Sequence, residues 1–258
     1  MAGTGRNLWT REEHILAFNL YCQIPFGTMH MGNPRVVELA RLIGRSVGAV
    51  SYKLSNFARL DPALKARDIR GNENGSKGEV EVWREFVNHP EDLAFESQRL
   101  LADRLNQPIE VVAEIDEQDL PPAGAEREAI VRVRINQSFF RRRIISAYEF
   151  RCCVTGLAVR ELLVASHIVP WAQDAANRLN PRNGLCLNAL HDRVFDRGLM
   201  WIDDGFVIRF SSRLGTDTKE NETALTWLRS FEGQRLRLPK EFTPDSNLLR
   251  VHANKWKA

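Results

Sequence analysis

The sequence lacks the features of membrane and secreted proteins. It has no run of 18 apolar residues, and the first residues, with Arg6, Trp9 and Arg11, contain no apolar signal core. Four cysteines are too few and too unevenly placed for a disulfide framework, and no CxxC pair is present to hold a structural zinc. We therefore expect a cytoplasmic protein with reduced thiols, no membrane partner and no structural zinc.

The composition and the distribution of charge indicate a globular protein with two basic regions. Of the 258 residues, 43% are hydrophobic and 27% are charged, which is ordinary for a folded chain. The net charge is +4 over residues 1–60, −9 over 61–130 and +8 over 131–258. Basic ends suit a polyanion such as DNA, whereas the acidic middle is better explained as a spacer.

The N-terminal region contains the signals of three helices. Thr10 precedes an apolar stretch and has Glu13 three residues on, which is a capping-box pattern. Asn33 and Pro34 begin a second helix, which should end at Gly44. Ser46 should cap a third helix, and two helices joined by a glycine turn predict a helix-turn-helix.

This helical pair has two interpretations. As a DNA reader, its second helix would enter the major groove and turn Ser51 and Lys53 toward bases or phosphates. The stretch LIGRSVGAVSYKL (42–54) resembles helix-turn-helix modules of bacterial DNA-binding proteins. As a plain helical hairpin, it would use Leu39, Val50 and Leu54 only as core. The sequence leaves both open.

The middle of the chain predicts a boundary between two domains. Residues 70–79 read as an exposed loop, residues 80–106 as helical, and 115–126 as a linker rich in proline, glycine and acids. The predicted fold class is α+β, with a mainly helical N-terminal domain followed by a second domain that contains both strands and helices. We predict domain limits of 1–115 for a helical, helix-turn-helix-like DNA-recognition domain, 116–136 for the linker and start of a connecting helix, and 137–258 for the second domain.

The connecting helix, predicted over about 129–148, ends in an arginine cluster. Arg141 and Arg142 lie just before the segment that carries the chemistry. Such a cluster is either a solvated helix face or a phosphate-contacting surface, and its position favours phosphate contact.

The segment 160–198 predicts strand, loop, strand and helix. RELLVASHIVPW (160–171) reads as a β-branched strand that ends at His167. A turn at Asn183-Gly184 precedes a short apolar strand and then a helix that carries His191 and stops at Gly198. Beyond it, 199–214 reads as a hairpin, and the remaining residues as scaffold with two further helices.

Four blocks of this segment together resemble the HNH endonuclease family in its restriction-endonuclease-like branch. They are RCCVTG (151–156), ASHIVPW (165–171), NGL (183–185) and LHDRVFDRGL (190–199), in the family's order and spacing. The resemblance covers roughly residues 137–250. It implies a ββα-metal fold in which a divalent cation, Mg²⁺ or Mn²⁺, lies between two strands and a helix.

The resemblance also implies a role for each matching residue. His167 would be the general base that deprotonates water. His191 would ligate the metal, and Asn183 would brace the loop between the strands. Arg193, on the same helix as His191, would touch a DNA phosphate or only solvent.

The sequence departs from the family pattern at one metal position. Ser166 stands where the commonest pattern has an Asp or His ligand. Because a hydroxyl is a poorer ligand than a carboxylate, either water completes the coordination or another group does, with Asp192 and Asp196 as candidates. The metal ligands predicted are thus His191, Ser166 and Asp192. Cys153 and Cys186 occupy positions where some members carry zinc ligands, and we interpret both as core residues.

Three functions remain compatible with the sequence. The favoured one is a metal-dependent endonuclease that cuts double-stranded DNA in restriction or defence. The second is a DNA-binding protein with a weak or inactive HNH fold, and the third is a nonspecific nuclease. Cuts on both strands need two active sites, which makes a homodimer a further hypothesis.

Overall fold

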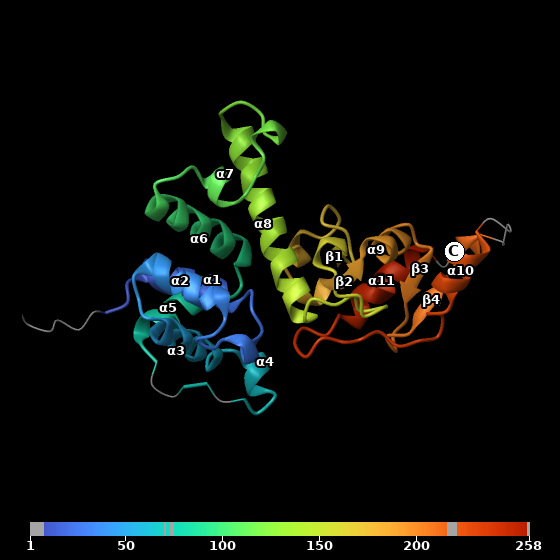
Figure 1. The fold of residues 1–258 in the computed structure, drawn as a ribbon, viewed down its shortest axis with the longest axis horizontal. Coiled ribbons are helices and arrows are strands. Elements are labelled where there is room, and N and C mark those ends of the chain that lie inside the picture. Colours follow the sequence, from blue (N-terminus) through green and yellow to red (C-terminus); the bar gives the residue numbers. More distant parts are fainter. Residues whose placement is uncertain (1–7, 70, 73–74, 216–220, 257–258) are drawn as a thin grey trace, which may run out of the picture. The chain divides into compact units, whose positions relative to one another are not determined.

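A computed structural model describes residues 8–69, 71–72, 75–215 and 221–256. The chain divides into two compact units, Met1–Phe139 and Phe140–Ala258, and the boundary falls within helix α8, Ala125–Ala147 (Figure 1). Helices and two small antiparallel sheets make this an α+β protein, as predicted. The helices of the described residues are each too short or too polar to cross a membrane.

The first unit is helical. Its helices are α1 (Arg11–Tyr21), α2 (Pro34–Ile43), α3 (Val47–Ala58), α4 (Pro62–Lys65), α5 (Lys77–Phe86), α6 (Pro90–Leu105) and α7 (Ile109–Val112), followed by the first part of α8. The three N-terminal helix starts are confirmed. Thr10 and Glu13 form the capping box of α1, Asn33 caps α2, and Ser46 accepts a hydrogen bond from the Ala49 amide at the start of α3.

Local backbone chemistry explains how the helices of this unit end. Gly44, with φ of 69°, ends α2 in the left-handed conformation that glycine adopts without steric cost. The helical stretch predicted over 80–106 is two helices, because it breaks around His89 before Pro90. Proline disfavours helical geometry in the preceding residue, and His89 accordingly has φ of −127° and ψ of 57°.

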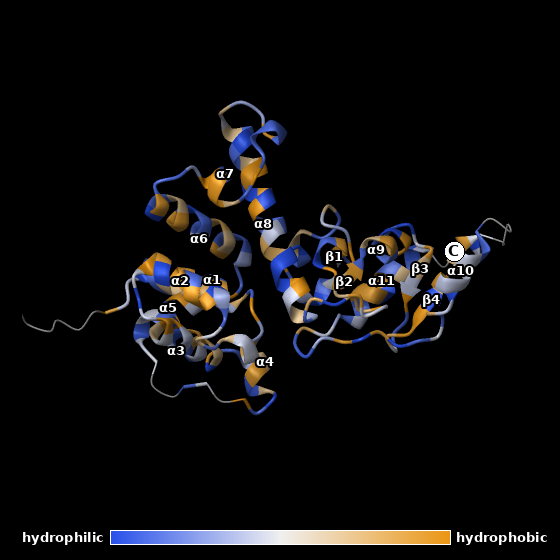
Figure 2. Cartoon of the chain, viewed as in Figure 1, coloured by the Kyte–Doolittle hydropathy of each residue, from blue (hydrophilic) through white to orange (hydrophobic). Residues whose placement is uncertain are grey.

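The core of the first unit is aromatic at its centre and contains a buried ion pair. Phe18 of α1 stacks on Phe57 of α3, with ring centroids 4.9 Å apart, and α5 adds Trp83. Beside them the Lys53 ammonium pairs with the Glu79 carboxylate, and both side chains are buried. Figure 2 shows the hydrophobic stripes of these amphipathic helices.

The second unit contains strand, loop, strand and helix in the predicted order. Its elements are β1 (Leu163–His167), β2 (Gly184–Asn188), α9 (Ala189–Asp196), β3 (Met200–Ile202), β4 (Ile208–Phe210), α10 (Glu222–Arg229) and α11 (Ser246–Trp256). β1 and β2 are antiparallel, and His167 lies opposite Gly184. β3 and β4 form the predicted hairpin around 199–214.

The β1–β2 sheet lies between two helices. On one face, α8 approaches so closely that a Cβ on Gly184 would lie 2.4 Å from Ile144 Cδ1 and 2.9 Å from Phe140 Cζ. Both side chains are buried, so neither can move aside cheaply. Residues directly opposite in an antiparallel pair share a face, so the side chain of His167 also points toward α8. α9 packs against the same two strands.

Candidate active site

Asn183 closes the loop between the strands, residues 168–183. Its side chain is fully buried, and its Nδ2 donates to the carbonyl oxygens of Val169 and Asn177, each at 3.1 Å. Its Oδ1 accepts from the Val169 amide at 2.8 Å, and its carbonyl accepts from the Ile168 amide at 2.9 Å. These bonds tie the first residues after His167 to the end of the loop, which is the geometry expected of a brace.

His167 is held by the same loop and by two aromatic rings. Its ring stacks on Phe140, with centroids 3.8 Å apart and planes 10° apart, and meets Trp171 edge-on at 5.6 Å. Its Nε2 lies 2.9 Å from the carbonyl oxygen of Arg178. Because a carbonyl only accepts, Nε2 carries the proton and Nδ1 keeps its lone pair. Burial lowers the pKa of His167, and the bond to Arg178 opposes this shift.

His191 is fixed by the residue that caps its own helix. Asn188 Oδ1 accepts from the His191 amide at 2.9 Å and from His191 Nδ1 at 3.0 Å. The amide contact sets the orientation of Asn188, so Nδ1 is the protonated nitrogen. His191 Nε2 then carries a buried lone pair that has no hydrogen-bond partner among the described residues. Burial lowers the pKa of His191 to about 4, so the ring is neutral near pH 7.

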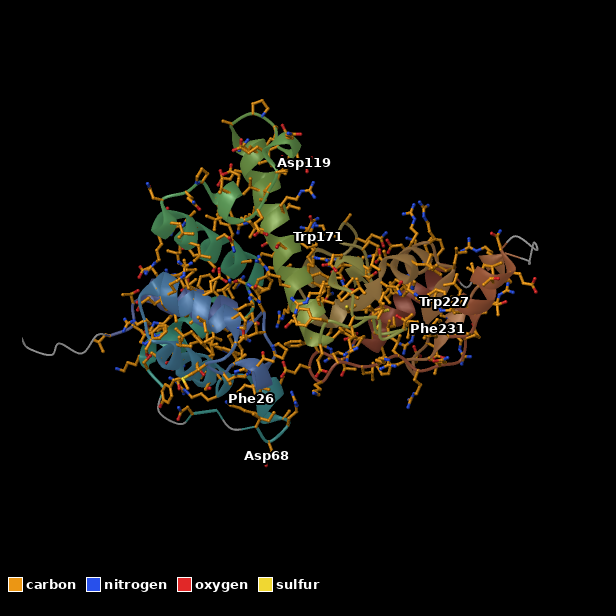
Figure 3. The ribbon with its side chains drawn as sticks, in the orientation of Figure 1. Phe26, Asp68, Asp119, Trp171, Trp227 and Phe231 are labelled. Atoms are coloured by element: carbon orange, nitrogen blue, oxygen red, sulfur yellow. The ribbon has the colours of Figure 1, made fainter. Side chains whose placement is uncertain are left out.

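Aromatic rings cover one side of His191. Trp227 of α10 and Phe231 just beyond it are labelled in Figure 3. Each meets the His191 imidazole edge-on, with ring centroids 5.3 Å apart. Such an apolar cover lowers the local dielectric and strengthens any interaction that the imidazole makes with a charge.

Ser166 and Asp192 lie close together on the α9 side of the sheet. The buried Ser166 hydroxyl has no hydrogen bond of ordinary geometry among the described residues. It still lies close enough to the Asp192 carboxyl to lower the pKa of that group slightly. Burial is the larger effect and raises the pKa of Asp192. Burial, and then repulsion from Asp192, likewise raises the pKa of Asp196 one helical turn on. A positive charge placed here would relieve both shifts.

The structure brings some predicted site residues together and separates others. Successive strand residues point to opposite faces, so Ser166 faces α9 while His167 faces α8. The described part of the chain holds no group of three or more His, Cys, Asp and Glu side chains arranged as a metal site. In this conformation, therefore, at most two described carboxylates or imidazoles near Ser166 can bind the same metal ion.

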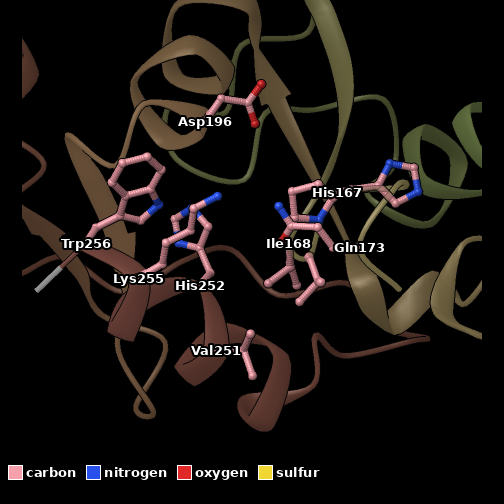
Figure 4. Close-up of a pocket in the computed structure, with 10 residues that line it drawn as sticks. His167, Ile168, Gln173, Asp196, Val251, His252, Lys255 and Trp256 are labelled. Atoms are coloured by element: carbon pink, nitrogen blue, oxygen red, sulfur yellow. The ribbon is translucent and has the colours of Figure 1, made fainter. Parts of the chain in front are cut away.

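A small cavity of about 40 Å³ lies beyond the end of β1 (Figure 4). Ile168, Asp196 and the α11 residues His252 and Trp256 line it, and the His167 ring points away from it. The cavity therefore shares the backbone of the candidate site but not the imidazole of the predicted base.

His252 is a residue of this region for which the sequence predicted no function. Its ring stacks on Phe195 of α9 with centroids 3.8 Å apart, and its Nε2 donates to the Phe195 carbonyl at 3.1 Å. Trp256 packs on Gly198, where a Cβ would lie 2.0 Å from the indole. α11 therefore supports the helix that carries His191. No sequence motif marks these contacts, because they join segments far apart in the chain.

The predicted DNA contacts differ in accessibility. Arg141, Arg142 and Arg193 are exposed. Ser51 is partly buried, and its hydroxyl donates to the Met29 carbonyl at 2.7 Å. Lys53, predicted to face DNA, is instead 5% exposed and paired with Glu79. Because its ammonium is paired inside the core of the first unit, Lys53 does not present its charge to DNA.

The cysteines of the second unit are buried thiols. Cys152, Cys153 and Cys186 are free and at most 1% exposed. Burial raises the pKa of Cys153 well above its usual value and that of Cys186 to about 12. Protonated thiols in a tightly packed interior act as small core residues.

Comparison with known proteins identifies the family of this part of the chain. Residues 152–203, which include β1, the loop, β2, α9 and β3, match the family model described as HNH endonuclease. A search of curated proteins found no match to the chain. Residues 152–203 therefore form a domain of the HNH endonuclease type.

Proposed function

We propose that this protein is a metal-dependent endonuclease that hydrolyses DNA phosphodiester bonds in restriction or defence. One observation carries the proposal beyond the family match. His167 and His191 each donate from one ring nitrogen to a fixed oxygen acceptor, which leaves the other nitrogen with its lone pair. One such nitrogen suits a general base, and the other suits a metal ligand.

His167 would act as the general base. Its pKa is lowered by burial, so the imidazole is neutral near pH 7 and its Nδ1 can take a proton from water. When the ring becomes positive, the Arg178 carbonyl at 2.9 Å stabilises it through Nε2. Asn183 keeps that carbonyl in place by closing the loop.

The residues on the α9 side fit a hard divalent cation. Among the described residues, the buried His191 Nε2 and Ser166 hydroxyl have no hydrogen-bond partner of ordinary geometry, and burial raises the pKa of Asp192 more than Ser166 and Arg193 lower it. Mg²⁺ commonly binds through one or two carboxylates and retains several waters, so a full protein cage is not required. Asp192, His191 and Ser166 would hold Mg²⁺ or Mn²⁺. When bound, the ion would neutralise a phosphate oxygen and stabilise the leaving 3′ oxygen.

The substrate in this proposal is double-stranded DNA. Exposed Arg141, Arg142 and Arg193 would contact its phosphates. The α2–α3 pair, with Ser51, would supply sequence or modification reading as a helix-turn-helix, in a domain over 1–115. Two copies of the 137–258 domain, one for each strand, would make the working enzyme a homodimer in the cytoplasm.

The experiment that tests the proposal is cleavage of supercoiled plasmid, unmodified and methylated, with Mg²⁺, Mn²⁺ or EDTA. Wild type should nick or linearise the plasmid only with metal, and His167→Ala should lose cutting while it still binds DNA. His167→Ala that cuts as well as wild type would show that the base is another residue. The His89→Ala variant, at an exposed histidine of the first unit outside the proposed chemistry, is the control for histidine loss.

A DNA-binding protein with an inactive HNH fold is the alternative. Ser166 in place of a carboxylate, and the separation of His167 from Asp192, favour it. DNA binding without cleavage under every metal condition would select this alternative.

A further inference from the structure

Arg178 is held in an unusual way for a charged residue on a loop. Its Nε donates to the Trp171 carbonyl at 3.0 Å, and its guanidinium lies over the Trp171 ring at 5.4 Å from the centroid. The side chain is only partly exposed. Two contacts to one tryptophan fix the plane of the guanidinium, and they use neither of its terminal amino groups.

No acidic side chain among the described residues pairs with this guanidinium. Asp174, the acid of the same loop, accepts hydrogen bonds from the backbone amide and side chain of Asn177 instead. A partly buried positive charge without a counterion is costly unless something outside the chain supplies the anion. A rigid guanidinium fork matches the paired oxygens of a phosphodiester.

The position of Arg178 ties it to the predicted base. Its carbonyl accepts the hydrogen bond from His167 Nε2, and Trp171 contacts the His167 ring edge-on. The loop that holds His167 therefore also carries the terminal amino groups of the Arg178 guanidinium. We propose that Arg178, presented by Trp171, forms a binding site for a DNA backbone phosphate next to His167. This inference rests on the proposed nuclease function for its choice of DNA.

The test measures binding of the full-length protein to a 30-bp duplex in EDTA, by fluorescence anisotropy over a range of salt concentrations. Arg178→Gln should weaken affinity about tenfold or more, as expected for the loss of a charge-assisted hydrogen bond. It should also reduce the slope of log Kd against log salt by about 0.9, the contribution of one phosphate contact. The His167 contact is spared because it uses the backbone of residue 178.

Two further variants separate a phosphate contact from general effects. Arg160→Ala removes an exposed arginine that also lies over an aromatic ring, 4.2 Å from the Phe150 centroid, and should leave the slope unchanged. Arg178→Lys keeps the charge and should keep most of the slope. Equal slopes for wild type and Arg178→Gln would overturn the inference. So would an equal loss in Arg160→Ala, or a loss in Arg178→Lys as large as in Arg178→Gln.

This test is independent of cleavage. Wild type that binds but never cuts would end the nuclease proposal and leave the phosphate site to be decided by the salt slopes. Wild type that cuts, with Arg178→Gln indistinguishable in affinity and slope, would end only the phosphate site.

Discussion

At the scale of single residues, oxygen acceptors decide what the two predicted catalytic histidines can do. A backbone carbonyl fixes the tautomer of His167, and a side-chain amide fixes that of His191. Near pH 7 a neutral imidazole can accept a proton or bind a metal ion through the nitrogen that carries the lone pair. The two side chains differ in exposure, since His191 is fully buried and His167 is only partly so.

The lowered pKa of His167 predicts the pH dependence of cutting. The single-turnover rate should be level from pH 7 to 8 and fall once the pH drops below the pKa of His167, which lies under its usual 6.5. Rates at constant ionic strength, with DNA binding over the same range as control, would test this. A decline that begins above pH 7 would contradict the assignment.

The lowered pKa values of these histidines also make the stability of the fold depend on pH. The folded chain holds His167 and His191 neutral to lower pH than the unfolded chain does, so the unfolded state binds protons first as pH falls. These histidines therefore stabilise the fold fully above about pH 6.5 and progressively less below it.

At the scale of elements, helix α9 depends on its cap for both structure and chemistry. The Asn188 side chain accepts hydrogen bonds from the His191 backbone amide in the first turn of α9 and from Nδ1 of the His191 ring. Asn188→Ala should cost about 1 kcal/mol in the free energy of unfolding, as for other helix caps. It should also raise the Mg²⁺ concentration needed for half-maximal cutting, because the imidazole loses its fixed tautomer.

Urea unfolding and a Mg²⁺ titration of plasmid cutting would measure these two effects. Asn188→Asp is the matched control, since a carboxylate oxygen can accept from the same two donors. Unchanged metal dependence in Asn188→Ala would mean that His191 does not need this anchor.

Local signals predicted most elements, and long-range packing explains the remainder. Cap residues such as Thr10 and Ser46 act within one helical turn, so the sequence reveals them. Burial of Lys53 depends on Glu79, and support of α9 depends on His252, and both partners lie on other helices. Helical periodicity cannot identify such partners. The separation of Ser166 and His167 onto opposite faces of the sheet was not predicted, although strand alternation alone produces it.

At the scale of the whole molecule, the chain contains two compact units with different residues to offer. The first unit is helical and the second holds the HNH domain. The predicted limits, 1–115 and 137–258, stay predictions about which part reads DNA and which part cuts it. α11 lies beyond the residues that match the family, yet its His252 supports α9.

Deletion of residues 1–115 tests this division of roles. The remaining chain should still cut plasmid with metal, because β1, β2, α9 and α11 are all retained. Its affinity or selectivity should fall if α2 and α3 read DNA, as measured by competition between specific and random duplexes. Equal affinity and selectivity after deletion would mean that α2 and α3 form a plain helical hairpin.

The 168–183 loop holds His167 through main-chain atoms. The carbonyl of residue 178 accepts the hydrogen bond from His167 Nε2, and the carbonyls of residues 169 and 177 accept hydrogen bonds from the side-chain amide of Asn183. Any amino acid supplies a carbonyl, so side chains of this loop other than Asn183 and Trp171 can change during evolution while the geometry around His167 persists. Its length cannot change as freely. If the loop contacts DNA as proposed, selection can therefore alter those contacts without changing the residues proposed to cut.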